Sequence, residues 1–511
     1  MVSRRGFLAG LAVVPLAGCA ARSGAPTPGS ATNASATRPL PIPPLAASSV
    51  GADGVRRFTL DIQQGTSEIL PGKRTATWGY NGAILGPTLR AERHESVAFT
   101  IRNSLPEPTT VHWHGMHVPA RCDGGPHQTI AVGGTWEPAW TIDQQAAMLW
   151  YHPHPHGATE KHVYRGLSGL FFVDDETTDT LDLPKEYGVD DIPLVIQDRR
   201  FTASGALDES DPTDVGLLGD TIVVNGIAGA HLDVRTDRVR LRVLNGSSGR
   251  IYNLAFDDHR AFQLIGTDGG LLTAPTTLSN IQVSPGERVE IVVELRSDER
   301  IMLRSLPIEQ RRNIDRAAAF GFDDTFDILQ LRAGKLEQSA PVPDSLTTIP
   351  ALAAPGTKPD YTFELKWFMI NGRQMDMNRI DMTIPVDSTQ VWSVRNNDNW
   401  PHNFHVHDVQ FQVVDIDGQA PPPALAGWKD TLYTEPQFTY RLAMRFAQHS
   451  DPTYPYMFHC HLLLHEDHGM MGQFLVLAPG QQAAPMRMDM PGMDMPGMGS
   501  GTTGNKPGHH G

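Results

Sequence analysis

Cysteine is scarce in this chain of 511 residues, which contains only three. So small a number excludes a fold built on a framework of disulfides. Basic residues are also in the minority, since 42 Lys and Arg stand against 57 Asp and Glu, and the formal net charge is −15. An acidic chain is a poor candidate for wrapping nucleic acid, because that affinity comes from Lys and Arg at the phosphates. Apolar runs of ~20 residues, which a membrane-spanning helix needs, are absent.

Glycine, proline, histidine and methionine are plentiful. The 48 Gly and 40 Pro indicate many turns and few long helices. At about 150 residues per domain, the length predicts about three domains. The 21 His and 18 Met, with so few Cys, indicate a soft or borderline metal ion.

The N-terminus has the pattern of an export signal. Arg4 and Arg5 precede an apolar run that is too short for a permanent membrane helix, and residues 1–18 resemble a twin-arginine signal peptide. The run ends in Leu-Ala-Gly-Cys, which resembles a bacterial lipobox, so we expect Cys19 to carry a lipid. An ordinary signal peptide with a chance cysteine is the alternative. Residues 19–50 are rich in Ala, Pro, Ser and Thr and predict a flexible tether to the membrane. We therefore expect a lipid anchor on the outer face of the cytoplasmic membrane or in the cell envelope.

A weak internal repeat divides the rest of the chain. Asn-Gly pairs begin at Asn81, Asn225 and Asn371, at spacings of 144 and 146 residues, and an alternating apolar and polar run follows each. Short alternating strands with such turns are typical of β-sandwiches and barrels. The pattern predicts an all-β protein with domains at 51–185, 186–340 and 355–480, followed by a Met-rich tail at 481–511.

Histidines cluster in the two outer units. Sixteen of the 21 lie within 112–162 and 402–468, in the motifs HWHG, HPH, HNFHVH and HCHLLLHEDHGM. In an extended strand, H-x-H places both imidazoles on one face. By the same alternation, Cys460 points away from its neighbours His459 and His461, so it can bind a different metal ion. Cys460 with His402, His465 and a weak axial Met470 is the ligand set of a blue-copper site. A zinc site or a buried free cysteine is the alternative.

Together the four motifs resemble the multicopper oxidase family, over roughly residues 51–480. The closest resemblance is to exported bacterial copper-tolerance oxidases. It implies three cupredoxin-like Greek-key β-barrel or sandwich domains. It also implies an oxidoreductase that couples four one-electron oxidations to the reduction of O2 to water, and it implies four copper ions, one of type 1, one of type 2 and a type 3 pair.

The resemblance also implies the copper ligands, position by position. Type 1 copper would take His402, Cys460, His465 and Met470. Type 2 copper would take His112 and His405. The type 3 pair would take His114, His152, His154, His407, His459 and His461. Asp123 and Glu466 match acidic residues near the trinuclear copper cluster, where they would deliver protons or merely orient ligands. The middle unit, which lacks ligands, would space and orient the other two.

The reducing substrate is expected to be Cu(I). Six Met between 486 and 498 would gather Cu(I), because thioethers select it. However, Trp400 stands where a Met is expected, and only Asp398 matches the acidic position of a substrate-copper site. This would leave the type 1 site more open, so small phenols or aromatic amines are the alternative reductants. A copper-free scaffold or a copper-storage protein is the alternative in a different class. We expect a monomer.

Overall fold

The computed structural model describes residues 35–309 and 311–484, and these residues confirm the all-β prediction. Its strands form six sheets, two in each third of the chain. The described helices are short: α1 (Thr159–Tyr164), α2 (Glu176–Thr180), α3 (Leu463–Asp467) and the 3-10 turns Ala120–Cys122, Ala317–Phe320 and Pro423–Leu425. None of the described helices has the length and apolar character needed to cross a bilayer.

In the first domain, one sheet runs β2 (Ser48–Val50), β3 (Arg56–Ser67), β6 (Ser96–Asn103) and β8 (Thr135–Trp136), with β4 (Thr75–Tyr80) beside β3 and β9 (Ala139–Thr141) beside β6. The other sheet runs β5 (Leu89–Glu92), β11 (Gly169–Asp174), β10 (Ala147–His152) and β7 (His112–His114). Cys122 is buried as a free thiol in the core between them, where it packs as a small apolar group.

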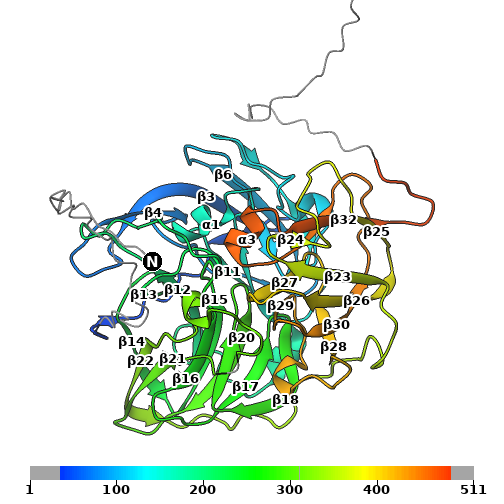
Figure 1. The fold of residues 1–511 in the computed structure, drawn as a ribbon. Coiled ribbons are helices and arrows are strands. Elements are labelled where there is room, and N and C mark those ends of the chain that lie inside the picture. The colour runs from blue at the N-terminus through cyan, green and yellow to red at the C-terminus, as the bar shows by residue number, and fades with distance from the viewer. Residues whose placement is uncertain (1–34, 310, 485–511) are drawn as a thin grey trace, which may run out of the picture.

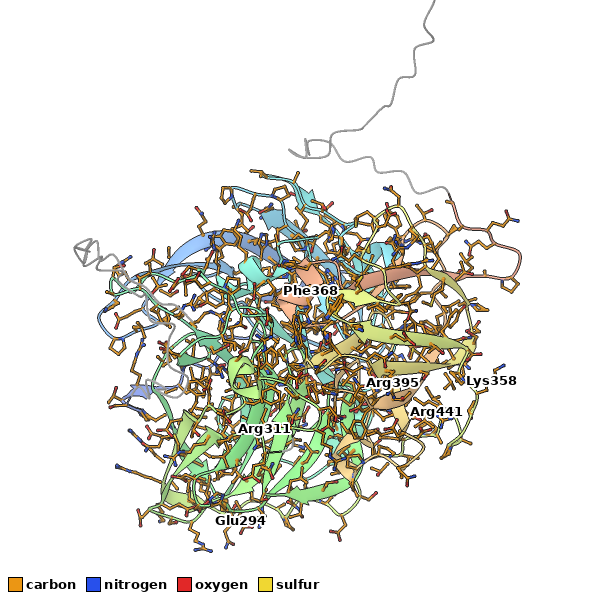
Figure 2. The ribbon with its side chains drawn as sticks, viewed as in Figure 1. Glu294, Arg311, Lys358, Phe368, Arg395 and Arg441 are labelled. Atoms are coloured by element: carbon orange, nitrogen blue, oxygen red, sulfur yellow. The ribbon has the colours of Figure 1, made fainter. Side chains whose placement is uncertain are left out.

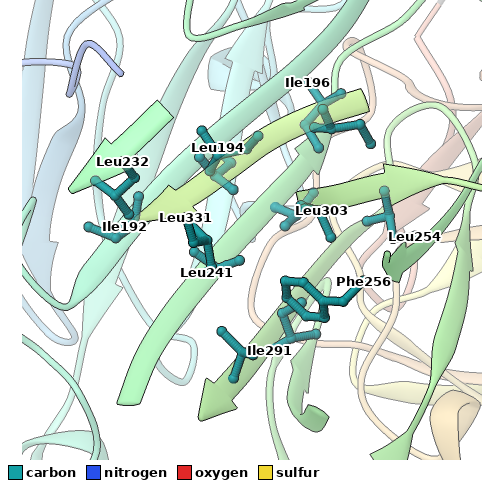
Figure 3. Close-up of a cluster of buried hydrophobic side chains, with 14 of the residues drawn as sticks. Ile192, Leu194, Ile196, Leu232, Leu241, Leu254, Phe256, Ile291, Leu303 and Leu331 are labelled. Carbon is teal, nitrogen blue, oxygen red and sulfur yellow. The ribbon is translucent and has the colours of Figure 1, made fainter. Parts of the chain in front are cut away.

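In the middle domain, one sheet runs β1 (Arg38–Pro39), β14 (Ala230–Thr236), β22 (Phe326–Glu337), β21 (Arg300–Ser305), β16 (Tyr252–Phe256) and β19 (Asn280–Val283). The other runs β13 (Thr221–Val224), β12 (Asp191–Arg199), β15 (Arg238–Asn245), β20 (Arg288–Glu294), β17 (Phe262–Thr267) and β18 (Gly270–Leu278). Figure 3 shows Leu, Ile and Phe side chains filling the space between the sheets. Each such side chain contributes about 1.5–3 kcal/mol when fully buried.

In the third domain, one sheet runs β24 (Met369–Ile370), β23 (Tyr361–Lys366), β26 (Ser388–Asn396), β30 (Thr439–Phe446) and β28 (Phe411–Ile416). The other runs β25 (Met382–Pro385), β32 (Met471–Leu477), β31 (Tyr456–His459), β27 (His402–Val406) and β29 (Thr431–Thr434). In Figure 1 the green middle domain lies at the lower left, with the blue-to-cyan first domain above it and the yellow-to-red third domain to its upper right.

The Asn-Gly repeat has the same structural role in each domain. Asn81, Asn225 and Asn371 all adopt the left-handed conformation, with φ of 55°, 47° and 53°. The side-chain amide of each donates to a backbone carbonyl of a neighbouring strand, at Thr59, Pro193 and Thr362 respectively. Asn tolerates this conformation better than most residues do, so the repeat marks an equivalent turn in three related units.

The tether predicted over 19–50 is wrong for its last part. β1 pairs in parallel with β14 of the middle domain, and β2 pairs with β3 of the first. Leu40 is only 8% exposed and joins the middle-domain core. The Pro- and Ser-rich composition concealed this, because an extended segment needs only free sheet edges and one apolar side chain to dock. Residues 19–34, the signal at 1–18 and the methionines at 486–498 lie outside the described residues.

Candidate metal centres

Three predicted ligands, His402, Cys460 and His465, meet in what we term the cysteine site. Cys460 Sγ lies 3.7 Å from His402 Nδ1 and 3.5 Å from His465 Nδ1, and the two Nδ1 atoms are 3.1 Å apart. His402 begins β27, Cys460 follows β31, and His465 lies in α3. All three are fully buried and could hold one metal ion.

Hydrogen bonds at the far side of each ring orient these histidines. His402 Nε2 lies 3.3 Å from a carboxylate oxygen of Asp398, and His465 Nε2 lies 2.8 Å from the carbonyl oxygen of Asp214, in the middle domain. Because these partners only accept, each Nε2 carries the proton and each Nδ1 keeps a free lone pair toward Cys460. Burial lowers the pKa of both imidazoles and raises the pKa of Cys460 to about 12. A bound cation would replace the thiol proton.

Met470 lies close to this site along the chain. It is fully buried in the same apolar cluster as Cys460, and its backbone carbonyl accepts a hydrogen bond from Cys460 N. A thioether in this cluster suits the weak axial ligand of a blue-copper site. Its role as a ligand stays a prediction.

The other eight predicted ligands gather where the first and third domains meet, and we term them the histidine cluster. Two close pairs join the domains: His154 Nε2 lies 3.1 Å from His459 Nε2, and the rings of His112 and His407 stack with centroids 3.8 Å apart. Overlapping sets of three within it could each hold a metal ion. The full cluster is His112, His114, His152, His154, His405, His407, His459 and His461.

Local structure confirms the H-x-H argument only in part. His112 and His114 both lie in β7. β10 ends at His152, β27 ends one residue before His407, and β31 ends at His459. The second member of each of these pairs therefore stands just beyond a strand end, outside regular structure.

The donor set fits soft or borderline metal ions. Burial lowers the pKa of all eight imidazoles, so they are neutral and offer lone pairs. His112 Nε2, His405 Nε2 and both ring nitrogens of His461 are buried without a hydrogen-bond partner among the described residues. Buried polar atoms are rarely left unpaired. Neutral nitrogens facing one another at 3.1–3.3 Å therefore indicate that cations complete the arrangement.

The predicted acids Asp123 and Glu466 both reach this cluster. Asp123 Oδ2 lies 2.8 Å from His407 Nδ1, and Glu466 lies 3.4 Å from His154 Nδ1 and 3.3 Å from His459 Nδ1. Burial raises the pKa of both carboxyls well above the usual range, and the neighbouring Asp408 and Asp467 add to it. Bound cations would lower these pKa values again. Orientation of ligands and delivery of protons both fit this position.

Sequence reasoning missed two polar residues of the third domain. Asp430 Oδ1 lies 2.9 Å from His114 Nε2, and the Asp430 carbonyl oxygen lies 2.8 Å from His405 Nδ1. Asn403 Oδ1 accepts from the backbone N–H of His461 and lies 3.5 Å from Cys460 Sγ. Asn403 sits inside the HNFHVH motif, which could have suggested a role. Asp430 carries no local signal, because its partner lies 316 residues away.

The expectation that the cysteine site is open is wrong. His465 is fully buried, and Phe368 and Trp400 cover it with ring centroids 5.1 and 6.4 Å from its imidazole. Figure 2 shows Phe368 beside the helix that carries His465. Asp398 is not free to bind a substrate cation either, because it is 2% exposed and accepts hydrogen bonds from His402 and from the Trp367 N–H. The site is not open even though Trp400 stands where a Met is expected, because aromatic rings fill the space.

Comparisons with known proteins agree over most of the chain. Three multicopper oxidase family models match residues 61–178, 201–312 and 345–480. A multicopper oxidase of Staphylococcus haemolyticus is 35% identical over 438 residues, covering 85% of this chain and 91% of the relative. The cell division protein FtsP of Escherichia coli is 32% identical over 482 residues, covering 93% and 99%. The crystal structure of a laccase from Pediococcus acidilactici superimposes with a TM-score of 0.80 at 34% identity, covering 88% and 96%.

Proposed function

This chain belongs to the multicopper oxidase family, and from that premise we propose that it oxidises Cu(I) to Cu(II) with O2, which is reduced to water, in copper tolerance. Four one-electron oxidations would balance each O2. The observation that carries the proposal is the buried cysteine site joined through Cys460 to a cluster of eight neutral imidazoles.

The donor sets support the assignment of four copper ions. Type 1 copper would be held by His402, Cys460, His465 and Met470, and the type 2 ion and the type 3 pair by the histidine cluster. Bound copper would supply reversible one-electron redox chemistry and a place for O2 to be reduced. The protein contributes ligand geometry, the hydrogen bonds behind each ligand and a dry site.

The chain also supplies a covalent path between the two sites. Cys460 belongs to the cysteine site, while its neighbours His459 and His461 belong to the histidine cluster. His459 Nδ1 further lies 3.1 Å from the Cys460 carbonyl oxygen, which adds a hydrogen-bonded shortcut. We propose that electrons travel along this segment, one at a time.

Reduction of O2 to two waters consumes four protons, and Asp123 and Glu466 are the candidates to supply them. They approach the cluster from different domains, and a carboxyl at either position lies close enough to the predicted ligands to pass a proton to a group bound there. Asp123 also holds the Nδ1 of the predicted ligand His407, so it would release its proton without leaving its position, and Glu466 lies 3.3 Å from His459 Nδ1.

A methionine-bearing segment of the third domain supports Cu(I) as the substrate. Gln374 Nε2 donates to the His468 carbonyl oxygen and Met375 N donates to that of Gly469, so the segment lies against the turn between His465 and Met470. Met369, Met375, Met377 and Met382 are partly exposed there. Thioethers near the cysteine site would attract and hold Cu(I).

Aromatic cover over the same site favours a second candidate, a laccase-like oxidase of phenols or aromatic amines. Phe368 and Trp400 lie on His465, and Trp367 beside them is 53% exposed. Aromatic substrates stack on such surfaces. The similar Pediococcus acidilactici protein carries the name laccase.

A non-catalytic role is the least supported, although one similar protein is named for cell division. A scaffold needs none of the buried nitrogens that face one another in the histidine cluster. Copper analysis of the purified protein, with its absorption spectrum, separates these classes. A blue, copper-loaded protein that consumes O2 supports the oxidase, whereas a colourless protein without O2 uptake refutes it.

The comparison of substrates uses the same preparation. O2 uptake is measured with Cu(I) and with a small phenol under matched O2 supply. We expect a higher kcat/KM for Cu(I). Deletion of residues 485–511 is expected to raise KM for Cu(I) and leave the phenol unaffected. A deletion that changes neither Cu(I) kinetics nor copper tolerance would remove the tail from the proposal.

We further propose export by the twin-arginine route and attachment through a lipid on Cys19. The N-terminal motif supports this, since Arg4, Arg5 and Cys19 stand at the expected places. Cys19→Ser is expected to release the protein from the membrane fraction, and replacement of both arginines by lysine is expected to block export. Unchanged fractionation of both variants would contradict the proposal.

A further inference from the structure

The middle domain supplies no predicted ligand, yet one of its side chains reaches the junction of all three domains. Arg288 begins β20 and is fully buried. Its Nε–H donates to the Met148 carbonyl of the first domain at 3.1 Å, and its two terminal nitrogens donate to Asp430 of the third domain at 2.7 and 2.5 Å. The remaining N–H groups donate to the carbonyls of Gly286 and Asp268 at 2.9 Å each. A guanidinium has five N–H donors, and all five are used.

Asp430 in turn contacts two predicted copper ligands from different domains. Its Oδ1 accepts from His114 Nε2 at 2.9 Å, which leaves His114 Nδ1 to face His152 Nε2 at 3.3 Å. Its backbone carbonyl accepts from His405 Nδ1 at 2.8 Å, which leaves His405 Nε2 without a partner among the described residues. The rings of His114 and His405 stack with centroids 3.8 Å apart. Thr431 Oγ1 lies 3.0 and 3.1 Å from the same two ring nitrogens, so Asp430 and its neighbour together set the orientation of both imidazoles.

The local sequence makes room for this ion pair. A Cβ at Gly115 would lie 2.4 Å from Asp430 Oδ2 and 2.8 Å from Arg288 Nη2. The glycine of the HWHG motif thus lets the pair lie against the end of β7. A Cβ at Gly286 would likewise lie 3.1 Å from the ring of His461. The turn before Arg288 packs directly on the histidine cluster.

Further charges hold the pair in place. Asp268 accepts from the backbone N–H of Arg288 at 2.7 Å and lies 3.0 Å from Lys429 Nζ, which lies 3.1 Å from Glu287. Three carboxylates therefore surround two cations in a buried network. These are Asp268, Glu287 and Asp430 around Arg288 and Lys429. An uncompensated buried charge is strongly destabilising. The fork of Arg288 consequently fixes the position of the Asp430 carboxylate.

We propose that Arg288 is a positioning residue for the histidine cluster and that it acts through Asp430 on His114 and His405. The middle domain then shapes the site where O2 is reduced rather than only spacing the other two. This inference rests on the proposed function, because it concerns copper bound by the cluster. In the described part of the chain, no ligand of the cysteine site forms a hydrogen bond or ion pair with Arg288 or Asp430, so this site serves as an internal reference.

The test compares Arg288→Lys and Asp430→Asn with Arg242→Lys in the copper-loaded protein. Lys keeps the charge of Arg288 but loses the fork, and Asn keeps the shape of Asp430. Arg242 is a matched control, because it is a buried middle-domain Arg that binds Asp191 through two nitrogens at 2.6 and 2.8 Å. The readouts are copper content, the blue absorption band, the electron paramagnetic resonance signal of the type 2 copper and O2 uptake.

We expect Arg288→Lys and Asp430→Asn to keep the blue band, to change the type 2 signal and to lower kcat about 10- to 100-fold, with KM for the reductant unchanged. Arg242→Lys is expected to keep both signals. The inference is tested on each of the two variants that is recovered with its blue band. If such a variant has the type 2 signal and the kcat of wild type, the inference is overturned. A wild type without copper or O2 uptake would instead refute the proposed function, so the two failures are distinguishable.

Discussion

Asp123 Oδ2 lies 2.8 Å from His407 Nδ1, although Asp123 belongs to the first domain and His407 to the third. Asp123 also accepts on its backbone carbonyl from His112 Nδ1, at 2.9 Å. The rings of His112 and His407 stack between these two contacts. A single residue thus joins one predicted ligand from each outer domain, and the domain interface and the metal centre depend on the same bonds.

Asp123→Asn is predicted to lower kcat by about 100-fold or more. The amide cannot release a proton, although it keeps the size of the carboxyl. If Asp123 delivers protons, the loss is larger at high pH, where water supplies fewer protons, and bleaching of the blue band by reductant without O2 is unaffected. The measurement is kcat from O2 uptake across pH, with anaerobic bleaching alongside.

Asp415→Asn is the matched control for Asp123, because Asp415 is a carboxylate 2% exposed that pairs with Arg441 in the third domain. It is expected to keep kcat. A loss of equal size at every pH in Asp123→Asn would assign that residue to orientation of His407 alone.

A double substitution, Met375→Leu with Met377→Leu, is predicted to raise KM for Cu(I) roughly tenfold, which corresponds to about 1.4 kcal/mol of binding. Leucine keeps the apolar volume and removes the thioether. KM for a phenol is expected to stay the same. Steady-state O2 uptake with each substrate gives the two values.

Met302→Leu controls for loss of a partly exposed methionine elsewhere, on β21 of the middle domain. If Met375→Leu with Met377→Leu leaves Cu(I) kinetics intact, this segment is not part of the Cu(I) site. An equal rise in KM for Cu(I) and for phenol would instead indicate a shared docking surface.

Glu160→Gln is predicted to remove a pH dependence of stability. Burial raises the pKa of Glu160, on α1, from 4.5 to about 7, and its carboxylate accepts from the Leu217 N–H at 2.8 Å. A raised folded-state pKa contributes stability below the unfolded value of 4.5, and that contribution is lost as pH rises toward 7. The loss amounts to up to about 3 kcal/mol at higher pH.

Urea unfolding of the copper-loaded protein at several pH values gives this free energy. Between pH 4.5 and about 7, wild type is expected to lose stability, and Glu160→Gln is expected to lose less. The control Glu309→Gln, at an exposed site, is expected to behave as wild type. Parallel curves for wild type and Glu160→Gln would rule out Glu160 as the source.

The strands and the clustering of the predicted ligands follow from local sequence. Alternation in β3 and the Asn-Gly turns are short-range patterns, and the histidines of one motif are neighbours along the chain. Contacts that cross domains have no such signature. Arg288 and Asp430 are 142 residues apart, and His465 meets the backbone of Asp214 at a separation of 251. A carbonyl oxygen carries no residue identity, so no motif could have indicated that Asp214 closes the cysteine site.

Two predictions made from the residue types alone are wrong, because the structure at these places depends on the geometry of the fold. Residues 38–50 have the Pro and Ser content of a tether, but free edges of two sheets accept them as strands. The missing methionine at Trp400 suggested an open site, but Trp400 and Phe368 fill that space. In both cases the outcome depends on which surfaces the rest of the fold leaves uncovered, which only the assembled structure contains.

The stoichiometry of the reaction shows whether the cysteine site and the histidine cluster work together as one oxidase. The copper-loaded protein is given Cu(I) in a closed cell, and the Cu(I) oxidised, the O2 consumed and any hydrogen peroxide formed are measured together. Four electrons reach O2 if the cysteine site and the histidine cluster act as one unit, so the account predicts four Cu(I) per O2 and no peroxide. Two Cu(I) per O2 with accumulation of peroxide, or no O2 uptake at all by the copper-loaded protein, would contradict it.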